Sequence, residues 1–166
     1  MKSPTLDYQL LRSQSVGTPY LSVRLTAQQS AVLPMDQVQE AIAIPTSRVT
    51  PIPNRSMCVL GLLNQKSRVI WVIDLPQMLG LQTQNLHVNQ QYNIAIIRSG
   101  KTPLGLVVPE IRGVLRFSTE TMTVTTEPDI SSIIPYLQGY ITQDTEHLWV
   151  LNPDSIINSP ILLQDL

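Results

Sequence analysis

Few residues of this 166-residue chain have a type and spacing suited to chemistry. The single cysteine, Cys58, lies in the apolar stretch 57–60, which is typical of a small buried side chain rather than of a reactive thiolate. The histidines, His87 and His147, lie far apart, and neither belongs to a cluster with metal-ligand spacing. A Cys–His nucleophile remains geometrically open, but no local motif supports it. The sequence therefore indicates no catalytic residue and no metal site.

Paired carboxylates and phosphate-binding loops are also missing from the pattern. Glu127 and Asp129 lie in a proline-containing loop and are expected to face water. The seven glycines are scattered and form no phosphate cradle. Gly105 and Gly113 fall in strand-like runs, where a bulge or a close backbone approach is the usual reason for glycine. We expect no cofactor, no small-molecule substrate and no enzymatic activity.

The composition excludes several other classes of protein. Hydrophobic residues make up 43% of the chain and charged residues 14%, which is enough apolar material for a folded core. The net charge is −1 and the sequence shows no basic stripe, so we expect no nucleic-acid partner. No apolar run approaches the roughly 18 residues that span a bilayer, and the first ten residues lack the apolar segment of a signal peptide. The expected location is the cytoplasm, without membrane insertion.

The hydrophobic periodicity predicts a mainly β protein. Residues 20–25 alternate between apolar and polar side chains, whereas 69–73 form a continuous β-branched run typical of a strand buried on both faces. Residues 104–117 predict a long strand bent near Pro109 or Gly113. Further predicted strands are 92–97, 136–141 and 147–151. Short helices are predicted after Asp74 and over 153–159, a flexible lead-in over 1–19 and a tail over 160–166.

An internal repeat organises these strands. Residues 61–75 align with 139–153 at a shift of 78, which superposes Gly61 on Gly139 and Trp71 on Trp149. Residues 20–25 fall on 92–97 at a shift of 72. This pattern predicts two similar β units in tandem, subdomain 1 over 20–84 and subdomain 2 over 92–151, separated by the polar segment 82–91. Units of about 70 residues are small for independent stability, so we expect them to share a packed interface.

The segments PMDQVQEAI (34–42), VLGLLNQKSRVIWVIDL (59–75), PLGLVVPEIRGVLRF (103–117) and YLQGYI (136–141) occur in this order. Together they resemble the CheW-like family of chemotaxis coupling proteins, from about Tyr20 to Asn158. The resemblance implies a single domain over 20–159, built from two five-stranded β-barrel subdomains packed side by side with short helices. It also implies a non-catalytic adaptor. Such an adaptor joins the tip of a methyl-accepting chemoreceptor to the regulatory domain of a CheA-type histidine kinase.

The resemblance carries a receptor-binding role to five residues of this chain. Val38 and Glu40 fall on the V-x-E positions, and Lys66 falls where the family usually has arginine. Asn93 and Val114 fall on positions at the groove between the barrels. A helical receptor tip could lay an apolar stripe in such a groove, with Glu40 and Lys66 setting its register. The kinase-binding residues are not indicated.

Several residues depart from the family pattern. Lys66 keeps the charge of arginine but loses its planar fork, and Ser67 replaces a glycine. Pro109 stands where aspartate is usual and Trp71 where proline is usual. We hypothesise a divergent paralogue from a system that steers phototaxis or pilus-driven motility.

Three other interpretations remain open at this stage. The domain could dock only on the kinase, or compete for it, without receptor binding. Glu40 and Lys66 could be an ordinary solvated pair worth about 0–1 kcal/mol. A small enzyme using Cys58 is the third and most distant alternative.

Overall fold

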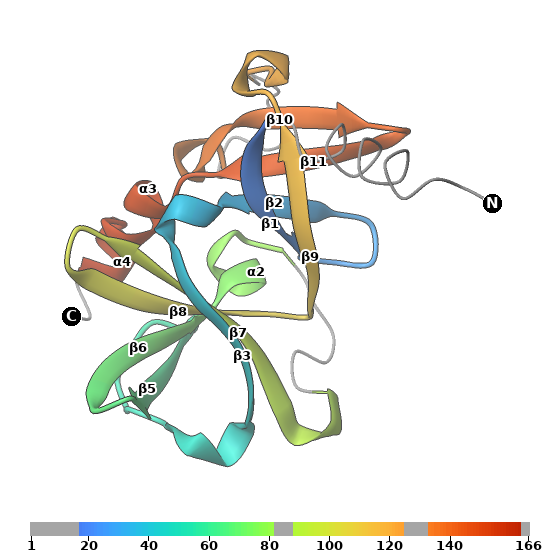
Figure 1. Ribbon diagram of the computed structural model, residues 1–166. Coiled ribbons are helices and arrows are strands. Elements are labelled where there is room, and N and C mark those ends of the chain that lie inside the picture. The colour runs from blue at the N-terminus through green and yellow to red at the C-terminus, as the bar shows by residue number, and fades with distance from the viewer. Residues whose placement is uncertain (1–16, 82–87, 125–132, 164–166) are drawn as a thin grey trace.

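The computed structural model describes residues 17–81, 88–124 and 133–163, and it consists of two curved β-sheets packed against one another (Figure 1). Sheet A has the strand order β10-β11-β2-β1-β9, and sheet B has the order β3-β7-β8-β6-β5-β4 and curls into a half-barrel. The prediction of a mainly β fold with two packed β units and short helices is confirmed at the level of the two sheets. The strands of sheet A are β1 (Thr18–Arg24), β2 (Ser30–Pro34), β9 (Glu110–Phe117), β10 (Leu137–Gln143) and β11 (Glu146–Leu151). Those of sheet B are β3 (Val38–Pro45), β4 (Val49–Thr50), β5 (Val59–Gln65), β6 (Arg68–Asp74), β7 (Gln91–Ser99) and β8 (Thr102–Val108).

The strand pairing confirms the internal repeat but corrects where the chain divides. β10, β11, β2, β1 and β9 of sheet A correspond to β5, β6, β8, β7 and β3 of sheet B, so the two sheets have the same order. Each repeat unit, however, gives its first two strands to the other unit's sheet. The sheets therefore do not follow the predicted subdomains 20–84 and 92–151: sheet B comes from 38–108 and sheet A from the segments on either side of it.

The exchange depends on two parallel pairings. β2 lies parallel to β11, with Val32 opposite Val150. β8 lies parallel to β6 in the same way, with Gly105 opposite Val72. Local sequence patterns identify hairpins, but they contain no signal for which distant strand a hairpin joins in parallel. In Figure 1, sheet A consequently combines blue strands with orange and red ones, whereas sheet B is teal to yellow.

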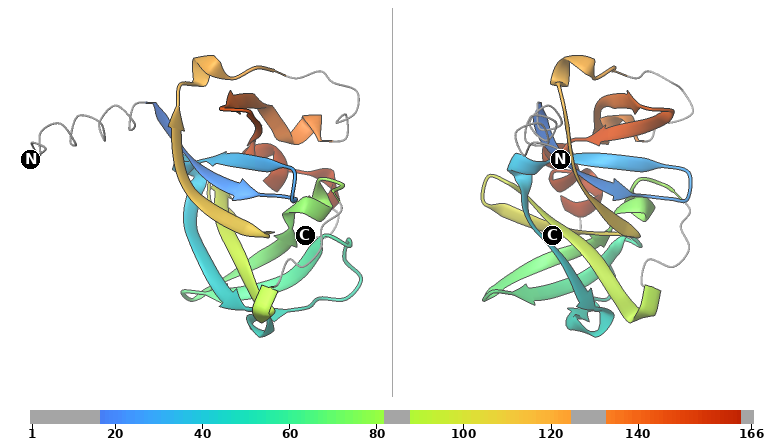
Figure 2. Two further views of the ribbon diagram at one scale, coloured as in Figure 1. Left: turned by 90° about the vertical axis from the view of Figure 1, so that its right-hand side faces the viewer. Right: turned by 45° about the vertical axis from the view of Figure 1, so that its right-hand side comes forward.

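Three hydrophobic clusters hold the fold, and the largest lies between the sheets. This central core takes side chains from both sheets and from the short helices, which lie at the junction of the sheets (Figure 2). A smaller cluster fills the inside of each sheet. The predicted shared interface is therefore confirmed, and neither sheet has a complete core without the other. Large central residues include Leu33, Ile73, Ile97, Leu106, Trp149 and Leu151.

The helices follow the predicted capping signals. Asp74 caps α2 (Leu75–Met78), because its carboxylate accepts a hydrogen bond of 3.0 Å from the backbone N–H three residues on. Asn152 caps α3 (Pro153–Ile157) in the same way, at 3.2 Å. The backbone N–H of Asp74 donates to Cys58 O at 2.7 Å, and that of Asn152 donates to Tyr136 O at 2.8 Å. Repeat-related helices thus begin with the same hydrogen bonds.

The remaining helices are single turns at element ends. They are α4 (Pro160–Leu163) and the 3₁₀ turns η1 (Met35–Gln37), η2 (Thr46–Arg48), η3 (Val88–Gln90), η4 (Thr119–Thr121) and η6 (Ile134–Tyr136). α4 places a helical turn inside the predicted tail 160–166, and β1 begins inside the predicted lead-in 1–19, of which residues 1–16 lie outside the described part. None of the helices in the described ranges has the length and apolar character that crossing a membrane requires.

Candidate functional site

The two edge strands that end the sheets, β3 and β9, are related by the repeat and share an irregularity. β3 has a β-bulge between Val38 and Glu40, against β7. β9 has one at the same place in the repeat, where Arg112 is the extra residue opposite β1. A bulge re-aims the side chains around it and interrupts the ladder, a device common beside functional sites. Both edges therefore present side chains that a regular strand would direct elsewhere.

The β3 edge carries an ion pair that joins it to the β5–β6 turn. Lys66 Nζ lies 3.3 Å from Glu40 Oε1, and Gln65 Nε2 donates to the same oxygen at 3.4 Å. Arg48 Nη2 in turn donates to Gln65 Oε1 at 3.2 Å and to Asn64 O at 3.0 Å. We call Arg48, Glu40, Gln65 and Lys66 the edge cluster. It ties the free edge of sheet B to the tip of the hairpin that faces it.

Exposure differs strongly within the edge cluster. The Lys66 side chain is 74% exposed, whereas that of Glu40 is 29% exposed. Glu40 follows the half-buried, inward-facing residues of β3, while Lys66 extends from the turn into solvent. The carboxylate is thus held by the fold, and the ammonium remains available to a partner.

The β5–β6 turn that presents Lys66 has a strained backbone. Lys66 has a φ of 51° and Ser67 a φ of 65°, the left-handed pair of a two-residue type I′ hairpin turn. Asn-Gly is the usual sequence of this turn, because positive φ is sterically unfavourable for most residues that have a Cβ. The replacement of glycine by Ser67 therefore does fall on a position that needs positive φ.

The other predicted receptor-binding residues are spread over the two sheets. Val38 lies two residues before Glu40 on β3 and packs partly against the central core. Asn93 lies on β7 opposite Ala43, and its Nδ2 donates to Pro109 O at 3.1 Å. Val114 is 53% exposed on β9, opposite Leu21 in sheet A. The structure thus gathers Val38, Glu40 and Lys66 at one edge of sheet B and places Asn93 and Val114 elsewhere.

The two remaining departures from the family pattern have structural consequences. Pro109 lies where the chain crosses from β8 to β9, and its carbonyl is held by Asn93. Trp71 packs partly against the central core, with the Arg55 guanidinium carbon 5.2 Å from its ring centroid. That geometry is a cation–π contact over the aromatic face. Its repeat partner Trp149 is a buried core residue, whereas Trp71 is partly buried at the border of that core.

The residues considered for nucleophilic chemistry lie in ordinary structural surroundings. Cys58 is 5% exposed in the central core, which confirms the interpretation as a small buried side chain. His147 lies on β11, with its ring edge-on to Tyr140 and its Nδ1 3.3 Å from Thr142 Oγ1. His87, Glu127 and Asp129 lie outside the described residues. Among those described, no group of three metal-ligating side chains converges.

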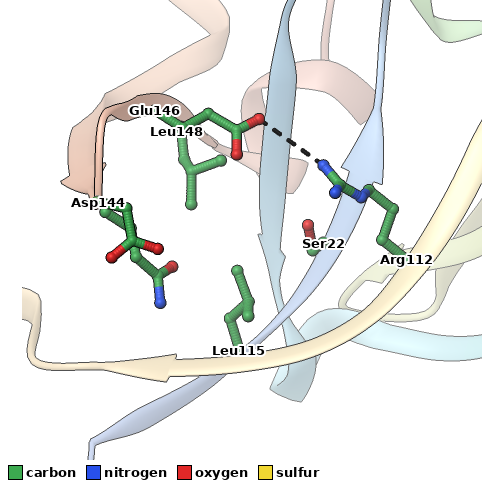
Figure 3. Close-up of a pocket in the computed structure, with 7 residues that line it drawn as sticks. Ser22, Arg112, Leu115, Asp144, Glu146 and Leu148 are labelled. Carbon is green, nitrogen blue, oxygen red and sulfur yellow. Dashed lines mark ion pairs between the residues drawn. The ribbon is translucent and has the colours of Figure 1, made fainter.

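Sheet A has a second charged group near its own edge strand, which the sequence pattern did not reveal. There Arg112 on β9 faces Glu146 on β11, with Nη1 and Oε1 3.7 Å apart (Figure 3). Asp144, at the β10–β11 turn, is the repeat equivalent of Lys66 at the shift of 78. The turn charge is therefore opposite in the two sheets, basic at Lys66 and acidic at Asp144, whereas Arg112 is the repeat equivalent of Gln39, the extra residue of the β3 bulge. The repeat shift was the signal that could have located these residues.

The fold, two exchanged repeat units with bulged edge strands, has a counterpart among solved structures. The structure superposes on the crystal structure of the scaffolding protein TtCheW from Thermoanaerobacter tengcongensis with a TM-score of 0.72. The match covers 82% of this chain and 90% of that one, at 18% identity. The model of the CheW-like domain matches residues 19–160, so this chain belongs to the CheW-like domain family.

Two named relatives span most of the domain. The chemotaxis protein CheW of Thermotoga maritima is 26% identical over 130 residues, which cover 78% of this chain and 82% of that protein. Protein PilI of Pseudomonas aeruginosa is 26% identical over 125 residues, covering 75% of this chain and 67% of that protein. The chain thus belongs to a scaffold and adaptor family of chemotaxis-type signalling, and it is similar both to a chemotaxis protein and to a Pil protein.

Proposed function

We propose that this chain is a non-catalytic cytoplasmic adaptor that couples a chemoreceptor-type sensor to a CheA-type histidine kinase in a two-component system controlling motility. Membership of the CheW-like family supports the class of function. The single structural observation that carries the proposal is the edge cluster, in which a solvent-directed Lys66 is held beside Glu40 on a bulged edge strand.

The edge cluster has the properties of a rim that orients a helical partner. Val38 supplies a partly exposed apolar contact next to Glu40, and Lys66 supplies an exposed positive charge. Charges at a rim raise the association rate and fix register, while the apolar contact supplies affinity. We infer that the tip of a methyl-accepting receptor docks along the β3 edge, with Asn93 and Val114 contributing farther along the two sheets.

The motility system is proposed from the similarity to protein PilI and from the departures at Lys66, Ser67 and Pro109. A divergent coupler that steers pilus-driven movement or phototaxis accounts for both. Deletion of the gene is expected to abolish directional movement while leaving movement itself intact. Unchanged directional movement would refute this assignment.

Calorimetric titration against the regulatory domains of the CheA-type kinases of the same organism tests the proposal. We expect binding in the micromolar range or tighter, about −8 kcal/mol. A titration with a receptor signalling tip follows, using Lys66→Glu. Lys101→Glu is the matched control, because Lys101 is another exposed lysine at a hairpin turn of sheet B. We expect Lys66→Glu to weaken receptor binding at least tenfold and Lys101→Glu to change it little.

Two outcomes would contradict parts of the proposal. Kinase binding without any receptor binding would favour a domain that only docks on the kinase or competes for it. Equal effects of Lys66→Glu and Lys101→Glu would mean that net charge, and not the edge cluster, governs receptor affinity. Absence of binding to every such kinase would reject the adaptor function itself.

A further inference from the structure

A pocket whose charged groups are all positive opens at one end of sheet B. It has a volume of about 210 Å³. Among the described residues, three cations line it together with a carboxamide, a glycine and a proline, and no carboxylate belongs to its wall. The lining residues are Gln39, Arg68, Arg98, Gly100, Lys101 and Pro103. We call this the basic pocket. A concave surface lined by charge of one sign concentrates ions of the opposite sign, so its natural guest is an anion.

The strand pairing brings these residues together from distant parts of the chain. Arg68 begins β6, which runs parallel to β8 and therefore starts at the end of the sheet where the β7–β8 turn carries Lys101. Arg98 pairs with Pro103 across the same hairpin. Gln39, the extra residue of the β3 bulge, lies beside the end of β7. The fold itself therefore gathers the three positive charges at one place.

The three cations have no structural partner within the part of the chain that the structure describes. The side chains of Arg68, Arg98 and Lys101 are exposed, and they make no hydrogen bond, ion pair or ring contact with any residue of the described ranges. The other described lysines and arginines each have such a partner; they are Arg24, Arg48, Arg55, Lys66, Arg112 and Arg116. The cations that the described fold leaves without a partner are thus the ones that line this pocket.

The same place in sheet A is neutralised by the fold. There Arg112 is the repeat equivalent of Gln39, and Glu146 is the repeat equivalent of Arg68. Their side chains form an ion pair, with 3.7 Å between Nη1 and Oε1. In sheet B the strand begins instead with a cation, and the bulge residue beside it is an uncharged amide. No described residue of sheet B therefore neutralises Arg68.

The hairpins that complete the two places differ in the same direction. At the shift of 72, Thr26 and Gln29 are the equivalents of Arg98 and Lys101. Thr26 Oγ1 accepts from the backbone N–H of Gln29 at 3.0 Å, and Gln29 Nε2 donates to His147 O at 3.1 Å. These neutral residues hold the β1–β2 turn against β11. Their equivalents in sheet B are cations without any such bond to a described residue.

We propose that the basic pocket binds a phosphate group. A phosphate ester carries a charge of about −1.5 to −2 at pH 7 and has three strong acceptor oxygens, so each cation contacts an oxygen of its own. Arg68 and Arg98 supply planar forks that suit bidentate contact, Lys101 supplies a point charge, and the Gln39 carboxamide adds a donor. A single carboxylate has two oxygens and one charge, which would leave part of the pocket's charge unmatched.

The phosphate group belongs either to a small free anion or to a phosphorylated side chain of a bound protein, and the two sources are separable by experiment. The basic pocket shares no residue with the edge cluster. Phosphate binding therefore goes beyond the adaptor function, and its failure would leave the receptor and kinase titrations unaffected.

The test is an amide chemical-shift titration of the full chain by NMR, in a phosphate-free buffer at about 0.15 M salt. Inorganic phosphate represents the free anion, and Nα-acetyl-O-phosphoserine amide represents a phosphorylated side chain. Nα-acetyl-glutamate amide is the carboxylate control. We expect saturable shifts at positions 39, 68 and 98–103, with a dissociation constant of about 1 mM for the phosphate probes and weaker binding of the control. The phosphate probe that binds more tightly identifies the source.

Arg68→Gln and Arg98→Gln remove the charges one at a time. Both residues are exposed and have no partner among the described residues, so neither change should lower the unfolding free energy in urea. We expect each to weaken phosphate binding about threefold and the double variant about tenfold, since an exposed charged contact is worth up to a factor of about five. Arg116→Gln, which removes an exposed guanidinium from β9 of sheet A, is the matched control and should change binding little.

Three results would overturn the proposal. The first is the absence of a saturable shift at the pocket positions with either phosphate probe. The second is equal affinity for the glutamate control, which would make the pocket a surface for carboxylates. The third is an equal loss of phosphate binding for Arg98→Gln and Arg116→Gln, which would mean that net charge, and not the pocket, attracts the anion.

Discussion

Alanine at Gly61 should destabilise the fold far more than alanine at Gly113, although both glycines have positive φ. Gly61 has a φ of 145° and lies in the β5 bulge, and Gly113 has a φ of 119° in the β9 bulge. A Cβ at Gly61 would collide with the carbonyl oxygen of Thr50 and lie 2.7 Å from its carbonyl carbon. A Cβ at Gly113 would meet nothing within 4 Å.

The magnitude follows from these two environments. Positive φ costs a non-glycine residue about 1–3 kcal/mol, and this term applies to both variants. At Gly61 the clash is with backbone, so β4 must also move away from β5 and disturb its two residue pairs with Leu62 and Leu63. Each lost hydrogen bond removes about 1 kcal/mol. We expect Gly61→Ala to lose about 3–5 kcal/mol and Gly113→Ala about 1–2 kcal/mol.

Equilibrium unfolding in urea measures both values, provided that the dependence of the unfolding free energy on urea is unchanged. Gly139→Ala extends the test to the repeat partner of Gly61, since a Cβ there would lie 2.5 Å from Thr123 O. It should be more destabilising than Gly113→Ala, with the Thr123–Tyr140 bridge disturbed in place of β4. Equal losses of unfolding free energy for Gly61→Ala and Gly113→Ala would refute the reasoning that the close approach of β4 requires glycine at position 61.

Three further predictions concern charge and turn geometry. Burial raises the pKa of Asp74 despite the opposing backbone hydrogen bond. The stability that the protonated carboxyl contributes is therefore fully present below the ordinary pKa of 3.8, and it is lost as the pH rises through the raised pKa. Asp74→Asn, which copies the cap at Asn152, should therefore gain stability over wild type as pH rises toward neutral, and a pH series of thermal unfolding in which the two curves stay parallel would contradict this. A double-mutant cycle of Glu40→Ala and Lys66→Ala in urea should give a coupling of about 0.2–1 kcal/mol, because Lys66 is mostly exposed; a larger value would make the pair a structural clamp. Ser67→Gly should raise the unfolding free energy by about 1 kcal/mol, because glycine adopts the φ of 65° without steric strain. A lower melting temperature of this variant in calorimetry would contradict the presence of strain at Ser67.

Local features of the fold could be predicted because their causes are local. The alternation in β1, the β-branched run in β6 and the caps Asp74 and Asn152 each specify their element by short-range sterics and hydrogen bonds. The exchange of the first two strands of each repeat could not be predicted in this way. It depends on parallel contacts between strands far apart in sequence.

The candidate site shows the same limit. The family resemblance selects Glu40 and Lys66, and the structure places their charged atoms 3.3 Å apart. Neither pattern nor resemblance selects Arg48 and Gln65, because their roles arise from the closure of sheet B, which brings η2 against the β5–β6 turn.

The two repeats differ where their side chains reach solvent and agree where the backbone needs a particular residue. Gly61 and Gly139 both admit a neighbouring carbonyl, and Asp74 and Asn152 both cap a helix. The edges instead diverge, with an acid facing a lysine in sheet B and an arginine facing acids in sheet A. Since packing constrains the first set and leaves the second free, differences in binding between the two halves should reside at these edges. A swap of the β5–β6 and β10–β11 turn residues should accordingly move partner preference while leaving the fold intact.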